Sequence, residues 1–265
     1  MAKQTPDRGV GYHKYRAADG CWRPPRPEGL ARVLAKAGYG ARPRTVEIVQ
    51  AGRVQIDGKV VSDPGAAVAP ASVVLLDEEP LTEAPRRYLV LNKPSGLECQ
   101  LRGGGSRDLT HMMPVDAVGL EVAGRMDARN SGLLLISNDL RWNRLVAESE
   151  LLERVFHVLV TGVVTSLVLD VLRAGINIQN QGTLRPRKVK IVRQADGRAL
   201  VAVALRGDHA RKVRAAFASL RCEVETLTLA EVGPVNVDDL SRGSVRDLSP
   251  EEQRQLLPPD ARGSR

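Results

Sequence analysis

The residues best suited to chemistry lie in the stretch "AGRMDARNSGLLLISND", residues 123–139. A single carboxylate, Asp127, stands between Arg125 and Arg129, just before a turn-like Asn-Ser-Gly sequence and an apolar run. A carboxylate held by guanidinium groups in front of a buried strand can be a catalytic group that is kept ionised at neutral pH. The alternative is that Asp127 only caps the local backbone of the turn.

Residue types that bind metals or form disulfides show no suitable spacing. The three cysteines, Cys21, Cys99 and Cys222, stand far apart, which argues against a zinc site or a disulfide framework and favours a reducing cytoplasm. The four histidines also lack ligand spacing, and we place His157 and His209 outside the site. No strand-Gly-x-Gly-x-x-Gly-helix unit is present, which argues against a dinucleotide-dependent enzyme.

The charge of the chain indicates its class of partner. The 265 residues carry a formal net charge of +8, with a pI of about 9.7. A basic balance favours a polyanionic partner, nucleic acid first, although a soluble protein can also be basic without one. The N-terminus lacks the apolar segment of a signal peptide, and no apolar run approaches the roughly 18 residues of a membrane span. We therefore expect a cytoplasmic protein without a membrane partner.

Residues 1–27 look like a basic, flexible tail that is stiffened at its end by prolines. Tyr12, Tyr15 and Trp22 are interleaved with its lysines and arginines. Such an arm can follow RNA, with its aromatic rings stacked on bases. It can equally be a solvated terminus without a ligand.

Residues 28–83 form a small domain. The stretch 30–40 predicts a helix that ends at glycines, and 44–52 predicts a second helix. Alternating apolar residues around Asp57-Gly58 predict a β-hairpin. Its basic residues fall in the first half, where helices with a clustered positive face suit a phosphate backbone. The residues that we expect to bind RNA here are Arg32, Lys36, Arg42, Arg44 and Arg53.

Residues 84–257 form a larger α+β domain, and residues 258–265 a short tail. Strands are expected at 86–93, 132–138, 154–162 and 199–207, with helices at 166–174 and 209–220. The second helix places Val213, Ala216, Phe217 and Leu220 on one apolar face. A last helix opens with a capping box at Ser249, Pro250 and Glu252.

The small domain resembles a known RNA-binding module. The stretch "LAKAGYGARPRTVEIVQAGRVQIDGKVV" is similar to the S-four (S4) RNA-binding domain, on the matches Ala37-Gly38, Arg42, Gly52-Arg53-Val54 and Gly58. Ala41, Pro43 and Asp57 depart from its pattern. The resemblance implies a small α/β module that contributes affinity for the RNA backbone.

The large domain resembles the RsuA-type ribosomal RNA pseudouridine synthases. Their central motif matches at Gly124, Arg125, Asp127, Gly132, Leu133, Leu134, Asn138 and Asp139. Further landmarks follow the family's order, at "LNKPSG" (residues 91–96), "RKVR" (residues 211–214) and "GSVRDLSPEE" (residues 243–252). The resemblance covers roughly residues 28–257. It implies a mostly antiparallel sheet in the large domain, preceded by the small RNA-binding module.

The family's chemistry assigns expected roles to residues of this chain. These enzymes isomerise uridine to pseudouridine in RNA without a cofactor or metal, after the nucleotide is flipped out of its stack. By this resemblance Asp127 is the catalytic aspartate, Arg214 pairs with it, and Arg125 fills the space that the nucleotide leaves. Phe156 occupies the place of an aromatic, usually tyrosine, that stacks on the base. We expect Arg125, Arg129 and Arg211 to bind RNA.

Plainer roles stand beside these. Arg125 and Arg214 can be surface phosphate contacts, Phe156 can be ordinary core, and Lys93 fits a support for the turn after its strand. The chain departs from the family pattern at Asn130, where threonine is usual, and at Leu229, where arginine is usual.

The sequence therefore predicts a monomeric pseudouridine synthase that acts on ribosomal RNA or a pre-ribosomal particle. The alternative is an RNA-binding factor for ribosome assembly without catalytic activity.

Overall fold

The computed structural model describes residues 28–101, 107–114, 117–207 and 209–261. The described residues form two compact units, one from residues 28–37 with 42–82, the other from 38–41 with the described residues between 83 and 261. The basic tail expected at residues 1–27 lies outside the described residues. Among those described, every helix is too short or too polar to span a bilayer.

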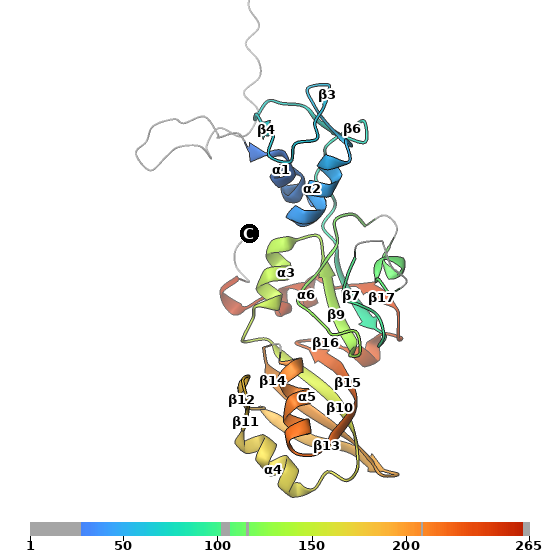
Figure 1. The fold of residues 1–265 in the computed structure, drawn as a ribbon, viewed down its shortest axis with the longest axis vertical. Helices are drawn as coiled ribbons and strands as arrows, with labels where there is room; N and C mark the ends of the chain where they lie inside the picture. The colour runs from blue at the N-terminus through green and yellow to red at the C-terminus, as the bar shows by residue number, and fades with distance from the viewer. Residues whose placement is uncertain (1–27, 102–106, 115–116, 208, 262–265) are drawn as a thin grey trace, which may run out of the picture. The chain divides into compact units, whose positions relative to one another are not determined.

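The first unit packs two helices beside short strands (Figure 1). Its elements are β1 (Glu28–Gly29), α1 (Leu30–Lys36), α2 (Arg42–Gln50), β2 (Val54–Ile56), β3 (Lys59–Val60), β4 (Ala67–Val68), β5 (Val74–Leu76) and β6 (Glu79–Pro80). An antiparallel sheet has the order β3-β2-β5-β6, and β1 pairs with β4. Leu30, Leu34 and Val49 from the helices and Val54 from β2 are buried in its core.

The hairpin predicted at Asp57-Gly58 is confirmed. Strand β2 pairs with β3 across these two residues, with Gln55 opposite Val60. Asp57 and Gly58 have φ angles of +50° and +78°. A two-residue turn with positive φ at both positions matches the twist of the strands, which explains why Asp-Gly is placed there.

The second unit is built on one large mixed sheet. Its strands are β7 (Tyr88–Lys93), β8 (Glu121–Val122), β9 (Ser131–Ser137), β10 (Glu153–Thr161), β11 (Ile176–Ile178), β12 (Gly182–Leu184), β13 (Lys188–Ala195), β14 (Arg198–Arg206), β15 (Glu223–Val232), β16 (Val235–Asn236) and β17 (Val245–Asp247). Its helices are η2 (Thr110–Met112), α3 (Leu140–Ala147), α4 (Ser166–Ala174), α5 (Ala210–Ser219), η3 (Val237–Asp239), α6 (Pro250–Leu256) and η4 (Pro259–Ala261). The sheet runs β13-β14-β10-β15-β9-β7-β17, and β11 and β12 form a separate hairpin.

The two halves of this sheet join at a short parallel pairing of β9 with β15. Ser131 lies opposite Thr228 and Gly132 opposite Leu229, while the other strand pairs of this sheet among the described residues are antiparallel. The hydroxyl groups of Ser131 and Thr228 lie 2.9 Å apart and share a hydrogen bond. Gly132 has a φ of +106°, and a Cβ there would lie 2.2 Å from the Leu229 carbonyl oxygen. Only glycine fits at this junction.

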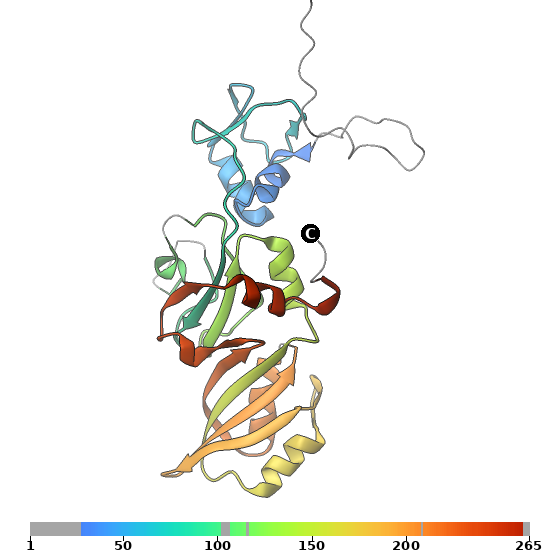
Figure 2. The same ribbon diagram turned by 180° about the vertical axis from the view of Figure 1, so that it is seen from behind.

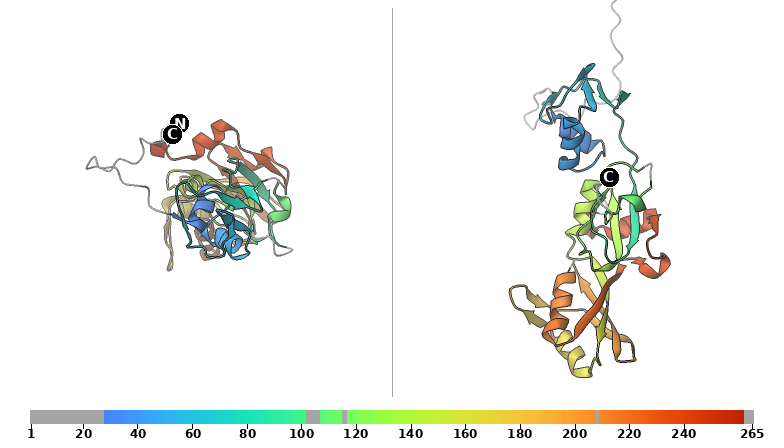
Figure 3. Two further views of the ribbon diagram at one scale, coloured as in Figure 1. Left: turned by 90° about the horizontal axis from the view of Figure 1, so that it is seen from above. Right: turned by 45° about the vertical axis from the view of Figure 1, so that its right-hand side comes forward.

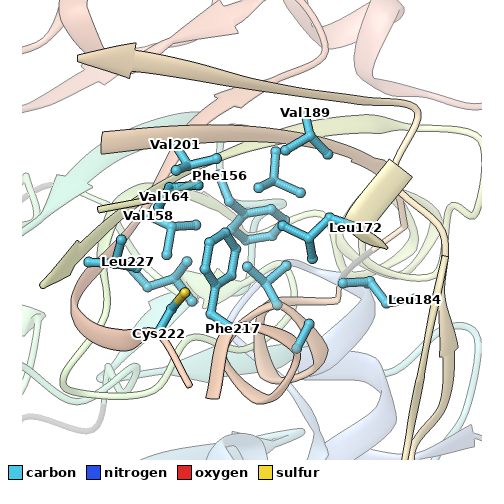
Figure 4. Close-up of a cluster of buried hydrophobic side chains, with 14 of the residues drawn as sticks. Phe156, Val158, Val164, Leu172, Leu184, Val189, Val201, Phe217, Cys222 and Leu227 are labelled. Atoms are coloured by element: carbon cyan, nitrogen blue, oxygen red, sulfur yellow. The ribbon is translucent and has the colours of Figure 1, made fainter. Parts of the chain in front are cut away.

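Helices α4 and α5 cover one face of β10, β13, β14 and β15 (Figures 1 and 3). Seen from behind, the strands lie in front and α5 behind them (Figure 2). The buried cluster between helices and sheet contains Phe156, Val158 and Val203 from strands and Val213 and Phe217 from α5. Figure 4 shows the rings of Phe156 and Phe217 pointing toward each other. The apolar face predicted for the helix at 209–220 is therefore confirmed.

Helices α3 and α6 pack on the other half of the sheet. Trp142 of α3 and Leu256 of α6 join a buried cluster with Val90 of β7 and Leu135 of β9. The capping box predicted for α6 is present: Ser249 accepts from the Glu252 N–H, and the Glu252 carboxylate accepts from the Ser249 N–H.

Candidate active site

Asp127 lies in the loop between β8 and β9. The N–H of Asn130 donates to the carbonyl oxygen of Asp127 at 3.0 Å, which closes a tight turn over residues 127–130. The Asp127 side chain remains 37% exposed. The turn thus presents the carboxylate to solvent at the start of β9, whose next residues are buried in the sheet.

Lys93, at the end of β7, anchors this loop. Its side chain is fully buried, and the ammonium group donates to the carbonyl oxygens of Pro94, Leu97 and Ala128 at 2.8–3.3 Å. The N–H of Gly96 donates to the same Ala128 oxygen at 2.6 Å. Burial lowers the pKa of Lys93, and three carbonyl partners satisfy its three donors. Lys93 therefore supports both its own turn and the residue next to Asp127.

The end of the central motif has a structural role. The carboxylate of Asp139 caps α3 by accepting from the N–H groups of Arg141 and Trp142, and it also accepts from the Tyr88 hydroxyl at 3.0 Å. Burial and the Asp139 charge raise the pKa of Tyr88 to about 12, so the hydroxyl keeps its proton. Asn138 binds the backbone before β7, accepting from the Arg87 N–H and donating to Pro85.

The two arginines of α5, Arg211 and Arg214, have other partners than the sequence predicted. A guanidinium nitrogen of Arg211, Nη2, lies 3.8 Å from Oδ1 of Asp127, and this is the ion pair that Asp127 forms within the described residues. Arg214 donates through Nη2 to Oδ1 of Asn130 at 3.0 Å and through Nη1 to the Val224 carbonyl at 3.1 Å. The prediction of a direct Arg214–Asp127 pair is therefore wrong for this structure. The Arg214 guanidinium binds Asn130 instead, because the Oδ1 acceptor of Asn130 lies within hydrogen-bond distance of it.

The charge of Arg214 nevertheless acts on this loop. Burial lowers the pKa of Arg214, the nearby charge of Arg129 lowers it further, and the charge of Asp127 raises it. Nε of Arg214 is buried without a hydrogen-bond partner among the described residues. Arg214 is thus a half-buried cation near Asp127, held by a neutral carboxamide.

A cleft of about 380 Å³ opens at Asp127. Its lining residues from the described part of the chain are Arg125, Asp127, Asn130, Gln181, His209, Ala210, Arg211 and Lys212. His209, which the sequence placed outside the site, therefore lines the cleft, because it is the N-cap residue of α5. Gln181 reaches the cleft from the β11–β12 hairpin, whose position no sequence motif indicated.

A smaller apolar cavity of about 40 Å³ lies beside the cleft and shares Arg125, Asn130 and Ala210 with it. Phe156 and Leu229 line this cavity as neighbours in the sheet, Phe156 on β10 opposite Leu229 on β15. Phe156 is only 2% exposed and belongs to the buried cluster of Figure 4. It is therefore a core residue that also borders the site.

Basic side chains lie around the Asp127 carboxylate, and Asp127 is the one acidic residue among the described residues that line the cleft. Arg125 and Arg129 are exposed on either side of Asp127, and Arg125 lines both the cleft and the cavity. Helix α5 has Arg211 and Lys212 in its first turn and no acidic residue there. Cations at a helix N-terminus are unfavourable, so this end of α5 favours an anion nearby. No cluster of three or more metal-ligating side chains occurs among the described residues.

The basic residues of the first unit divide into two groups. Lys36 forms an ion pair with Glu28, Arg44 with Glu47, and Arg53 with Asp77. The bond to Asp77 raises the pKa of Arg53 and lowers that of Asp77. Arg32 and Arg42 are exposed, and neither has an ion-pair partner within the described ranges.

Known proteins resemble this chain in both of its domains. Residues 28–74 match the S4 domain family. An uncharacterized RNA pseudouridine synthase of Mycobacterium bovis is 32% identical over 88% of this chain and 94% of its own length. Ribosomal large subunit pseudouridine synthase B of Bacillus subtilis is 26% identical over 86% of this chain and 95% of its own length.

A further relative and a solved structure extend the comparison. Ribosomal small subunit pseudouridine synthase A of Vibrio parahaemolyticus is 27% identical over 84% of this chain and 97% of its own length. The crystal structure of a pseudouridylate synthase superposes with a TM-score of 0.60 at 22% identity, over 87% of this chain and all of that one, and so shares the fold. The match at 32% identity over 88% of the chain and the S4 match together show that this chain belongs to the RNA pseudouridine synthases of the RsuA type, RNA isomerases with an N-terminal S4 domain.

Proposed function

We propose that this protein isomerises a specific uridine of ribosomal RNA to pseudouridine, with Asp127 as its catalytic carboxylate. The observation that carries the proposal is the cleft of about 380 Å³ in which Asp127 faces Arg125, Arg211 and Lys212. This volume falls in the usual range for small-ligand sites, about 300–1,000 Å³. The surrounding cations suit the phosphates that flank a flipped nucleotide.

The chemistry needs few groups. The bond between N1 of the base and C1′ of the sugar breaks, a bond between C5 and C1′ forms, and the proton lost from C5 is balanced by one gained at N1. In our proposal Asp127 starts the reaction as an ionised group, either by attacking the sugar or by removing a proton from it. Arg214 supplies positive charge beside it, and RNA would close the site over both groups.

The base would enter the apolar cavity beside the cleft, between Phe156 and the loop of Arg125. At about 40 Å³ the cavity is far smaller than the usual small-ligand site of about 300–1,000 Å³. A pyrimidine ring therefore requires side chains at the entrance to move. Of the three residues shared by cleft and cavity, Arg125 is the exposed one, and we assign it the space that the nucleotide leaves.

The substrate assignment rests on relatives. One relative is named for the large ribosomal subunit and another for the small one, so ribosomal RNA is the proposed substrate, as naked RNA or within a pre-ribosomal particle. We place the reaction in the cytoplasm and assign it to a monomer. Arg125, Arg129 and Arg211 of the large domain and the basic residues of the S4 domain would hold the RNA.

The test compares wild type with Asp127→Asn on ribosomal RNA tritiated at C5 of its uridines, because isomerisation releases that tritium to water. Asp127→Asn should reduce turnover at least about 1,000-fold and leave RNA affinity nearly unchanged, because the isostere removes only the charge. Asp170→Asn, an exposed carboxylate of α4 that does not line the cleft, is the matched control and should retain turnover. Near-normal turnover by Asp127→Asn would refute the role of Asp127.

A second measurement maps pseudouridine across both ribosomal RNAs in cells with and without the gene. One site should disappear when the gene is deleted, and its position names the subunit. If no site changes and wild type releases no tritium from RNA or from particles, the protein acts instead as an RNA-binding factor. One observation favours this second function: Phe156 is only 2% exposed, so its ring is packed in the core and is not open to stack on a base.

A further inference from the structure

We infer that Asn130 is a positioning residue: its carboxamide holds the guanidinium of Arg214 beside Asp127, and turnover depends on that hold. The inference rests on the proposed function, since it concerns the same reaction. It adds a residue at which this chain departs from the motif of the family, which has threonine there.

Asn130 connects the two groups directly. Its N–H donates to the Asp127 carbonyl oxygen at 3.0 Å, and its Oδ1 accepts from Nη2 of Arg214 at 3.0 Å. The residue is only 4% exposed and lines the cleft and the cavity alike. A buried residue fixed at its backbone to the aspartate turn can therefore set the position of the Arg214 side chain relative to that turn.

Arg214 has little else to fix it. The other hydrogen bond of its guanidinium joins Nη1 to the backbone carbonyl of Val224 at 3.1 Å, and Nε has no partner among the described residues. One remaining bond leaves the planar group free to rotate about that contact. Loss of the Asn130 acceptor would also leave Nη2 as a second unsatisfied donor, which is costly in a half-buried group.

The Asn130 acceptor that binds Arg214 is uncharged, and this matters for the charge that Asp127 experiences. A carboxamide orients the guanidinium without cancelling its charge, so that the charge stays available to Asp127. The direct ion pair of Asp127, to Arg211 at 3.8 Å, is longer than a hydrogen bond and involves a side chain that is 78% exposed. Arg214, held by Asn130, is the better-ordered cation next to the carboxylate.

The simpler explanation is that Asn130 only closes the turn and fills the wall of the cleft. The two explanations differ in how Asn130 and Arg214 combine. If Asn130 acts through Arg214, its loss has no further effect once the guanidinium is gone. If it acts only on the turn, its loss costs the same factor with or without the guanidinium.

The experiment is a double-mutant cycle of Asn130→Ala and Arg214→Lys, read by tritium release under single-turnover conditions with ribosomal RNA tritiated at C5. Asn130→Ala alone should lower the rate about tenfold to 100-fold, the effect expected when a reacting group is misplaced by about 1 Å. Its half-saturating concentration for RNA should stay within about twofold of wild type. In the Arg214→Lys background the same change should alter the rate by less than about twofold.

Asn143→Ala is the matched control. Asn143 is also buried, at 6% exposure, and its side chain binds the backbone of Glu121 and Ser137 without lining the cleft. This variant should lose stability in urea unfolding and keep the wild-type rate. If Asn130→Ala does not fold, Asn130→Leu takes its place in the cycle, because leucine has a similar shape and no hydrogen-bond acceptor for Arg214.

The outcomes separate the two proposals. An equal rate factor for Asn130→Ala in both backgrounds, or an unchanged rate for the single variant, overturns the positioning role and leaves the proposed function intact. Absence of tritium release by wild type overturns the proposed function before any variant is compared, and the positioning role with it.

Discussion

Arg211 and Asp127 face each other across the cleft with 3.8 Å between Nη2 and Oδ1, and both side chains are partly exposed. Exposed ion pairs contribute little, about 0–1 kcal/mol, and salt screens them. RNA phosphates can therefore compete for Arg211. Arg214 is held inside by Asn130 and Val224 and is not so easily displaced. Two arginines one helical turn apart thus have different roles to test.

Arg211→Met and Arg214→Met should separate affinity from turnover. Arg211→Met should weaken RNA binding and leave turnover at saturation close to wild type, because Arg211 meets phosphate. Arg214→Met should lower turnover at least about 100-fold with little loss of binding, and cost about 1–3 kcal/mol of stability through its lost hydrogen bonds. Titration of RNA binding, single-turnover rates and urea unfolding measure the three quantities. If both variants only weaken binding, and by the same factor for every RNA, Arg214 is a backbone contact.

Phe156 has a natural control in Phe217. Both rings are buried in the cluster of Figure 4, at 2% and 0% exposure. Of the two, Phe156 alone lines the cavity beside the cleft. Phe156→Leu and Phe217→Leu should each cost about 1–3 kcal/mol in urea unfolding. Only Phe156→Leu should also lower turnover, because it removes the ring proposed to stack on the base. Equal turnover of the two variants at a temperature where both are folded would make Phe156 a core residue only.

Local features of the fold could be predicted from the sequence because neighbouring residues decide them. Asp57-Gly58 supplies the backbone conformation of a two-residue hairpin, and Ser249 with Glu252 satisfies the free N–H groups at the start of α6. The same holds for α5, where apolar residues at helical spacing meet the sheet. In each case the signal and the structure lie within a few residues of each other.

Features that depend on distant residues could not be predicted in this way. The parallel pairing of Ser131 with Thr228 joins strands nearly a hundred residues apart, and it is this pairing that requires glycine at 132. The β11–β12 hairpin gave no clear signal because its turn is polar, and β13 was not assigned although Lys188 and Lys190 alternate with Val189 and Ile191. Gln181 therefore went unassigned, His209 was placed outside the site although it lines the cleft, and Arg214 was paired with the wrong partner.

The capping box of α6 predicts a specific pH dependence. The Glu252 carboxylate accepts two hydrogen bonds from Arg246 at 2.7–2.8 Å and one from the Ser249 N–H. The bond to Arg246 lowers the pKa of Glu252 below its ordinary value of 4.5. A lowered folded-state pKa stabilises the protein above the unfolded value, and this stabilisation is lost as the pH falls through the folded value.

Glu252→Gln should therefore cost about 1–2 kcal/mol of unfolding free energy at neutral pH. The difference from wild type should shrink on acidification below about pH 4, as the wild-type carboxylate takes up a proton. Glu251→Gln, in the same helical turn but with an exposed ion pair to Arg254, is the control and should stay near wild type. Urea unfolding at several pH values measures all three proteins. A difference that is constant with pH would mean that the charge of Glu252 contributes nothing.

The S4 domain offers a test of which cations meet RNA. Arg32 and Arg42 have no ion-pair partner in the described part of the chain, whereas Arg44 and Arg53 are paired with Glu47 and Asp77. Arg42 gives up no ion pair when it binds phosphate, and Arg32 gives up only an attraction to Glu28 that forms no ion pair, so we expect these two arginines to carry more of the affinity. Each phosphate contact to single-stranded RNA contributes about −0.7 to the slope of log affinity against log salt.

Arg32→Ser with Arg42→Ser should therefore flatten the salt slope by about 1.4, twice the single contribution, and weaken binding at low salt. Arg44→Ser with Arg53→Ser removes the same formal charge and should flatten the slope less, because Glu47 and Asp77 already offset those cations. Both double variants should keep the wild-type rate once RNA is saturating, because Asp127 and its cleft lie in the other unit. RNA titrations at several salt concentrations and single-turnover rates decide the matter. Equal slopes for the two double variants would show that ion pairing on this surface does not select the cations that meet RNA, and a lost rate at saturation would show that the S4 domain takes part in the chemistry.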